Sequence, residues 1–181
     1  MKRILLPAAL VVVFGIAAGS EFVSVRRNLS NQRAVIDSQW DELSDALEDR
    51  AELVANLAGM IQRVENPHDS AVEDATESSK KLKDAQAREE KIAANARLMT
   101  AFARLYLEAE RRPKLTESPE YKRLNEEIGG AESRVAVERR KYNDLLEHYN
   151  AQLQRFPQNI VAGLSGLSRI DAYVQTEQEI R

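Results

Sequence analysis

IDSQWDELSDALEDRAELVANLAGMIQRV, residues 36–64, is the stretch that decides the fold of this chain. One residue in every three or four belongs to a regular, mostly apolar stripe. Alternating steps of four and three place such a stripe along one side of an α-helix, and its slow drift makes neighbouring helices wrap around each other. The stretch therefore predicts a long helix, about 31–65, that packs against other helices. Its stripe consists of Ile36, Trp40, Leu43, Leu47, Arg50, Val54, Leu57, Ile61 and Val64.

The same repeat returns later in the chain and predicts a second long amphipathic helix over about 119–156. Ser118-Pro119-Glu120 is typical of a helix start, with a capping hydroxyl, a proline in the first turn and an acid beside it. Gly129 and Gly130 each cost about 1 kcal/mol relative to alanine inside a helix. The stripe passes through them in register, which favours one continuous helix. It consists of Tyr121, Leu124, Ile128, Ala131, Val135, Glu138, Tyr142, Leu145, Tyr149, Gln152 and Phe156.

Two further helices are expected around these. Residues 70–112 carry a poorer stripe that includes Glu89, Ile92 and Ala96, and Asp69 or Ser70 offers an N-cap. A shorter segment, about 158–175, contains two glycines and needs tertiary packing to be helical. Short turns make successive helices antiparallel. We therefore expect an all-α protein, in which an N-terminal membrane helix precedes an elongated antiparallel up-down bundle of three long helices and a shorter C-terminal helix. In this arrangement the first and third long helices run parallel.

The N-terminus differs sharply from the rest of the chain. Lys2 and Arg3 precede an uninterrupted apolar and small run over residues 4–19, and Glu21 ends it. A secretory signal has a basic start, a short apolar core and small residues at the cleavage site. A membrane anchor needs about 20 apolar residues, and a helix over residues 4–23 is about 30 Å long. Both alternatives direct the chain to the membrane and the bundle out of the cytoplasm.

Composition limits the classes of function. The 181 residues include 30% charged residues, 7 glycines and 5 prolines, which is typical of solvated helices. The net charge of −3, with acids and bases interspersed, argues against a nucleic-acid partner. There is no cysteine, and His68 and His148 have no second ligand at metal-binding spacing. No nucleophile motif or phosphate loop is present. We therefore expect no cofactor, no metal and no enzymatic activity.

Two polar features are candidate sites. Arg50 and Glu138 interrupt apolar stripes at corresponding depths of two helices predicted to be parallel, and Glu89 falls near the same level. These three residues are expected to form a buried polar layer that fixes helix register, with an alternative role in ligand binding. A second stripe lies beside the core stripe. Its residues form either a hydrogen-bonded seam against a neighbouring helix or a docking surface for a partner protein: Asn56, Glu132, Arg139, Asn143, Leu146 and Asn150.

The motifs in these helices resemble those of the LemA family of bacterial membrane-anchored helical proteins. The third helix reads Glu132-Ser-Arg134-Val135, then Arg139 three residues before Tyr142-Asn143, and Phe156-Pro157 at its end. The first helix carries Trp40 and then RAELVANL at 50–57, similar to the family's Arg-Ala-Asp-Leu-Ile-Pro-Asn-Leu, with alanine in place of the proline. The resemblance covers about 40–157. It implies an N-terminal membrane helix, which favours the anchor over the cleaved signal, and it brings no established enzymatic activity.

The expected organisation is an anchor with its basic flank at 1–27, a LemA-like bundle at 28–175 and a polar tail at 176–181. We expect a single-pass protein of the inner membrane whose bundle is a non-enzymatic scaffold or adaptor for a protein partner. Residues 4–23 would contact the membrane, and association between copies of the chain stays open. One alternative is a soluble periplasmic coiled-coil protein released by signal cleavage. Another, an enzyme with a site in a bundle crevice, has no supporting motif.

Overall fold

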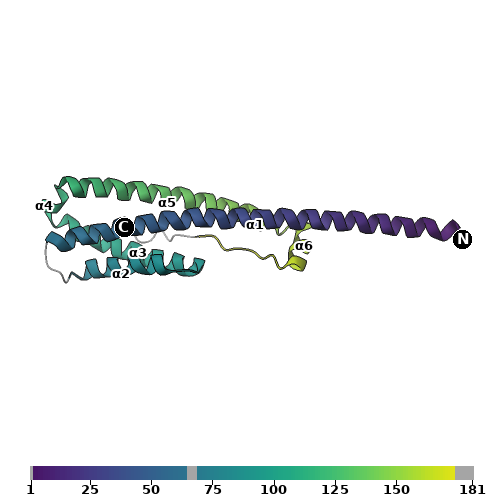
Figure 1. Ribbon diagram of the computed structural model, residues 1–181, viewed down its shortest axis with the longest axis horizontal. Coiled ribbons are helices and arrows are strands. Elements are labelled where there is room, and N and C mark those ends of the chain that lie inside the picture. Colours follow the sequence, from purple (N-terminus) through teal and green to yellow (C-terminus); the bar gives the residue numbers. More distant parts are fainter. Residues whose placement is uncertain (1, 65–68, 174–181) are drawn as a thin grey trace. The chain divides into compact units, whose positions relative to one another are not determined.

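A computed structural model describes residues 2–64 and 69–173 of the chain, and side chains within these ranges apart from 2–18 and 64. All regular elements of the described residues are helices, which confirms the predicted all-α fold. Figure 1 shows their order along the chain. The helices are α1 (Lys2–Val64), α2 (Ser70–Asp84), α3 (Arg88–Glu110), α4 (Pro113–Thr116), α5 (Pro119–Gln152) and α6 (Gln158–Ser165).

The chain forms two compact units. One, which we call the central unit, contains Gln39–Tyr142 and Tyr173–Arg181. The other, the terminal unit, contains Met1–Ser38 and Asn143–Ala172. Helices α1 and α5 each contribute one segment to each unit, and the units are described separately below.

The core of the central unit follows the predicted stripes closely. On α1 the apolar stripe residues from Trp40 to Ile61 are all buried, and Arg50 is buried with them. On α5 the stripe is buried at Tyr121, Leu124, Ile128, Val135 and Tyr142, while Glu138 is half-buried. Apolar burial of this kind is the main favourable contribution to folding. The 3–4 periodicity therefore predicted the inward face of both long helices in this unit.

The direction of α5 differs from the prediction. In the central unit Gln39 Nε2 donates to Glu138 Oε2 at 2.7 Å, and Arg134 Nη1 lies 2.6 Å from Asp49 Oδ2. Later residues of α5 thus pair with earlier residues of α1, so the two helices are antiparallel. The prediction of parallel first and third helices is wrong, because residues 70–112 form two helices instead of one. The chain reverses between α2 and α3 and gains an extra change of direction (Figure 1).

The reversal occurs at residues 85–87, where Ala85 and Ala87 have extended backbone angles. Asp69 caps α2 as predicted, through Oδ1, which accepts a hydrogen bond from the Ala71 N–H at 2.9 Å. No side chain caps α3 at Ala87. The break also resets the helix register, so the expected stripe through Glu89, Ile92 and Ala96 is not the buried one. The buried residues of α3 are Lys91, Asn95, Leu98, Ala101, Leu105 and Ala109.

The terminal unit corrects two further expectations about helix ends. Helix α1 continues through residues 28–31, where a helix start was predicted, and Leu29 is fully buried. Helix α5 is continuous through Gly129-Gly130, as predicted, but ends at Gln152. The stripe changes register there: Leu146 is buried, Leu145 is half-buried, and Phe156 is 78% exposed.

Helix α6 is shorter than predicted. Its C-cap residue Gly166 has φ +67°, a left-handed conformation that glycine adopts without steric cost. The Leu167 N–H then donates to the Ala162 carbonyl at 3.0 Å, which closes the helix end. Residues 167–173 carry no regular structure.

Within the part of the chain that the structure describes, no helix combines the length and the apolar character needed to cross a bilayer. Most of the side chains of the predicted anchor, residues 4–23, lie outside the described residues. His68 and the polar tail predicted at 176–181 also lie outside them.

Candidate functional site

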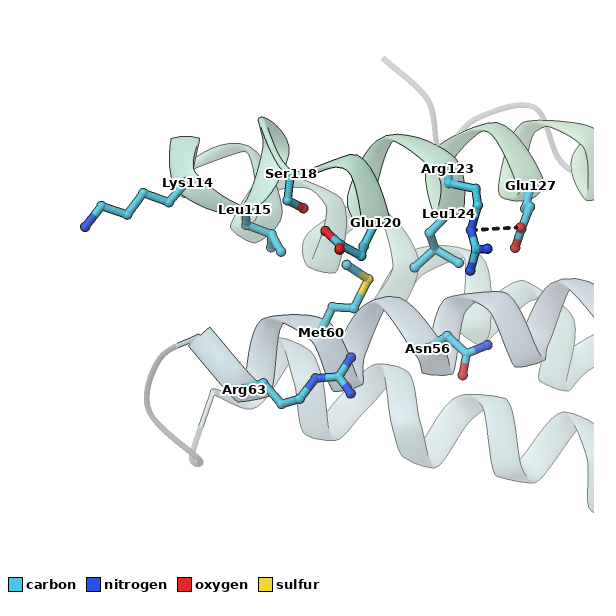
Figure 2. A pocket seen from close by; sticks show the side chains of 11 residues that line it. Asn56, Met60, Arg63, Lys114, Leu115, Ser118, Glu120, Arg123, Leu124 and Glu127 are labelled. Carbon is cyan, nitrogen blue, oxygen red and sulfur yellow. Dashed lines mark ion pairs between the residues drawn. The ribbon is translucent and has the colours of Figure 1, made fainter.

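The candidate site is an open cleft of about 600 Å³ in the central unit. It lies between the C-terminal end of α1 on one side and α4 with the start of α5 on the other, as Figure 2 shows. Met60 projects from α1 toward the α5 side of the cleft. The lining residues are Asn56, Gly59, Met60, Arg63, Lys114, Leu115, Ser118, Glu120, Arg123, Leu124 and Glu127.

Local sequence explains how the α4–α5 side of this cleft is built. Pro113 begins α4, and the Leu115 side chain is buried beneath it. Ser118 then caps α5, because its Oγ accepts a hydrogen bond from the Tyr121 N–H at 3.2 Å. Two short-range helix-start signals, Pro113 and Ser118, therefore define the corner between α4 and α5. Leu115 and Leu124 line this corner, and both side chains are largely buried.

The cleft carries charges of both signs. Some of them form ion pairs with described residues, and others do not. Arg123 Nε and Glu127 Oε1 form an exposed ion pair at 3.6 Å. Arg63, Lys114 and Glu120 form no ion pair with any residue that the structure describes. In Figure 2 the Lys114 side chain extends outward at the rim. On the α1 side, a Cβ at Gly59 would meet nothing within 4 Å, so the surface is open there.

The lining of the cleft is partly apolar and partly charged. It contains apolar side chains next to single charges, without a histidine or a nucleophile with an adjacent base. Over residues 2–64 and 69–173, no three histidine or acidic side chains group closely enough to hold a metal ion. An apolar and charged cleft of this size accommodates a few side chains of a peptide segment.

The predicted polar layer of Arg50, Glu89 and Glu138 is wrong. The reversed direction of α5 changes the surroundings of Arg50 and Glu138, and the break at 85–87 resets the register of Glu89. Glu89 is exposed on the first turn of α3. Glu138 accepts hydrogen bonds from Gln39 at 2.7 Å and from Lys141 of its own helix at 3.0 and 3.2 Å. The bonds from Lys141 and Gln39 lower the pKa of the Glu138 carboxyl.

Arg50 instead belongs to a buried polar cluster with Asn95 and Tyr173. Its Nη2 donates to Asn95 Oδ1, and Asn95 Nδ2 donates to the Tyr173 hydroxyl at 2.6 Å. Arg50 is 3% exposed, and its Nε has no hydrogen-bond partner among the described residues. Burial lowers the pKa of the Arg50 guanidinium, while the negative charge of Glu132 opposes this shift. The cluster therefore holds a cation in the core through a neutral amide.

In the second predicted stripe Asn56 is exposed, and the other polar members are half-buried. Asn56 lines the cleft, Glu132 and Arg139 lie near enough to Arg50 to act on its charge, and Asn143 is half-buried on α5. Asn150, in the terminal unit, makes the clearest contact. Its Nδ2 donates to the Ile170 carbonyl at 2.7 Å, and its Oδ1 accepts from the Ile170 N–H at 3.1 Å. This part of the stripe therefore binds the chain's own irregular segment rather than a helix.

The two hydrogen bonds of Asn150 lead to a prediction about proteolysis of the segment around Ile170. Asn150→Ala should free the segment around Ile170, because each lost bond removes about 0.5–1.5 kcal/mol. Trypsin should then cleave after the exposed Arg169 about tenfold faster or more, as local opening becomes more frequent. His148→Ala is the matched control, since His148 is exposed and bonds only within its own helix, to the Asp144 carbonyl. Equal cleavage of both variants would show that Asn150 does not hold the segment.

Several contacts in the central unit involve residues that sequence reasoning missed. The Arg88 guanidinium lies over the rings of Trp40 and Tyr142, at 5.2 and 5.8 Å from their centroids. Lys91 is buried and contacts Glu48 as an ion pair, with a further bond to Ser44 Oγ at 2.7 Å. In the sequence these bases look like the many charged residues of solvated helices, but Lys91 is buried and Arg88 is half-buried. No periodic signal marks Arg88, Lys91 or Asn95 as inward-facing unless the break at 85–87 is known.

Comparison with known proteins places these features in a family. The sequence model of the LemA family matches residues 39–181. No protein with a curated description matches the chain.

Proposed function

This chain belongs to the LemA family, and we propose that it is a single-pass membrane protein whose helical bundle acts as a non-enzymatic scaffold or adaptor. In this proposal the N-terminal part of α1 is the anchor, placed in the inner membrane with the bundle outside the cytoplasm. The bundle captures a segment of a protein partner in the cleft beside Met60. The observation that carries the proposal is this open cleft, lined by apolar and charged residues on three helices.

The chemistry of the cleft favours a particular kind of partner segment. Met60 offers a flexible apolar surface, and methionine adapts readily to a bound side chain. Arg63 and Lys114 lack ion-pair partners among the described residues, so a carboxylate can reach them without breaking an existing pair. We therefore propose that the partner segment carries an apolar residue followed or preceded by an acidic one.

The membrane anchor is supported by the sequence and by helix continuity. Lys2 and Arg3 precede the apolar run of residues 4–19. The backbone is helical without a break from Lys2 to Val64, so the proposed anchor and the cleft-lining residues belong to one helix. Family membership adds weight to the anchor over the cleaved signal.

Site-specific photo-cross-linking in the native host tests the cleft. A photoreactive residue at Met60 should form a discrete adduct that one at the exposed Leu107 does not. Adding Arg63→Glu with Lys114→Glu should reduce this adduct at least about tenfold, since attraction becomes repulsion at two positions. The control is Lys80→Glu with Lys122→Glu, which makes the same charge change at two exposed lysines outside the cleft. An adduct that both double variants weaken equally would exclude the cleft as the binding surface.

The intact mass of the protein in the membrane fraction tests the anchor separately. We expect the full chain of 20.4 kDa to be retained in membranes. A mass that corresponds to a chain beginning after Gly19 would instead support the soluble periplasmic alternative.

A further inference from the structure

Large exposed apolar side chains are unevenly distributed over the described residues. Val23, Val35, Phe156, Ile160 and Leu164 all belong to the terminal unit, whereas the central unit exposes only Leu107 and Val137 among such residues. Soluble surfaces rarely gather apolar residues in this way without a binding function. The concentration of exposed apolar side chains in the terminal unit therefore indicates that this unit contacts another surface.

The strongest part of this patch is an apolar face on and before α6. Ile160 and Leu164 lie one turn apart on α6, and Phe156 lies in the turn just before it. The side chains of Phe156, Ile160 and Leu164 are 78%, 52% and 74% exposed. The opposite face of α6, with Val161 and Ala162, is buried in the unit. A short helix with one face packed and the other apolar and open has the character of an interfacial helix.

The position of this face within the terminal unit points to the lipid surface. Gln32 Nε2 donates to Gln152 Oε1 at 2.8 Å, so the end of α5 lies level with Gln32 on α1. Gln32 is nine residues beyond Val23, the end of the proposed anchor, or about 14 Å along the helix. Figure 1 shows α6 beyond the end of α5, in the direction of the N-terminal end of α1. The lipid headgroup layer is about 7 Å deep on each side, and α6 lies on the side of the end of α5 that faces this layer.

In the stretches beside the face and the proposed anchor, four exposed arginines outnumber two exposed acids, Glu21 and Asp171, which fits an anionic lipid surface. Arg155 precedes Phe156 and Arg169 follows α6, and both are exposed. Arg26 and Arg27 are exposed on α1 just past the proposed anchor. Arginines beside an apolar face strengthen binding to anionic headgroups.

We propose that Phe156, Ile160 and Leu164 insert into the headgroup region of the membrane, so that α6 is a second membrane contact beside the anchor. This proposal rests on the proposed anchor, because the anchor places the terminal unit at the membrane. Its occupant is lipid, in preference to a second copy of the chain. Two contacts on one surface would hold the unit in a defined orientation on the bilayer.

The experiment uses the full chain in vesicles and a single introduced cysteine, since the chain has none of its own. Leu164→Cys carries an environment-sensitive fluorophore, and the lipids carry doxyl quenchers at a shallow chain position. Vesicles contain phosphatidylcholine alone or mixed with phosphatidylglycerol. We expect a blue-shifted emission and quenching several-fold stronger than for Val137→Cys, an exposed apolar position of the central unit. Phosphatidylglycerol should increase the quenching, and Arg155→Gln with Arg169→Gln should remove that increase.

Two further labels separate the outcomes. A label at Val12→Cys reports the anchor through quenchers placed deep in the bilayer. Deep quenching at Val12→Cys without shallow quenching at Leu164→Cys overturns the α6 proposal alone, whereas loss of both overturns the anchor as well. A blue shift at Leu164→Cys that grows with protein density and resists lipid quenchers assigns the face to a second copy and also overturns the lipid proposal. Finally, Phe156→Ser with Leu164→Ser should reduce quenching of a label at Ile160→Cys several-fold if the face inserts as one surface.

Discussion

Leu47→Asp is expected to unfold the central unit, with a loss of at least about 4 kcal/mol in the free energy of unfolding. Leu47 is fully buried in the α1 stripe. An aspartate there exchanges apolar packing for a carboxylate without a partner in the core. For a chain of this size the loss corresponds to a fall in Tm of about 8–16 °C, measured by circular dichroism at 222 nm.

Leu107→Asp is the matched control for this experiment. Leu107 is 58% exposed on α3, so the same substitution should change stability by no more than about 0.5 kcal/mol. If both variants melted within about 3 °C of the wild type, Leu47 would not be a core residue and the assignment of the α1 stripe would fail.

The second large effect concerns the buried Arg50 cluster. Asn95→Leu should cost about 3–5 kcal/mol, because it leaves a buried guanidinium without its amide acceptor. No carboxylate lies within 4.0 Å of Arg50 among the described residues, so no ion pair compensates for the loss. Once Arg50→Met has removed the charge, Asn95→Leu should cost only about 1 kcal/mol, for the lost bond to Tyr173. Urea unfolding of the two single variants and the double variant completes this double-mutant cycle.

A Ser79→Ala variant is the reference for removal of a buried polar group without a charge. Ser79 is 3% exposed, and its hydroxyl has no hydrogen-bond partner among the described residues, so its removal should cost little. Strictly additive losses for Arg50→Met and Asn95→Leu would contradict the cluster, because they would mean that the two side chains do not interact.

The sequence by itself determined the helical content and the inward faces of the long helices. The 3–4 spacing identified Leu43, Leu47 and Leu57 as core residues, and all three are buried. It also predicted correctly that α5 continues as one helix through Gly129-Gly130. Capping signals at Asp69 and Ser118 located two helix starts, since each depends on atoms only two or three residues apart. Periodicity and caps are local in sequence, so the sequence displays them directly. The LemA family motifs are a property of the sequence too, and the family assignment was confirmed.

Only the tertiary structure decided the direction of α5 and therefore which residues meet. The break at 85–87 contains no glycine or proline and has no side-chain cap, so no local rule marks it. Contacts with distant residues accompany it: Arg88 lies over Trp40 and Tyr142, and Lys91 pairs with Glu48. The free energy of such contacts depends on neighbours that lie 43 to 54 residues away in the chain. For this reason the sequence correctly identified Arg50 as a core residue but predicted Glu138 as its partner. In the fold its partner is Asn95.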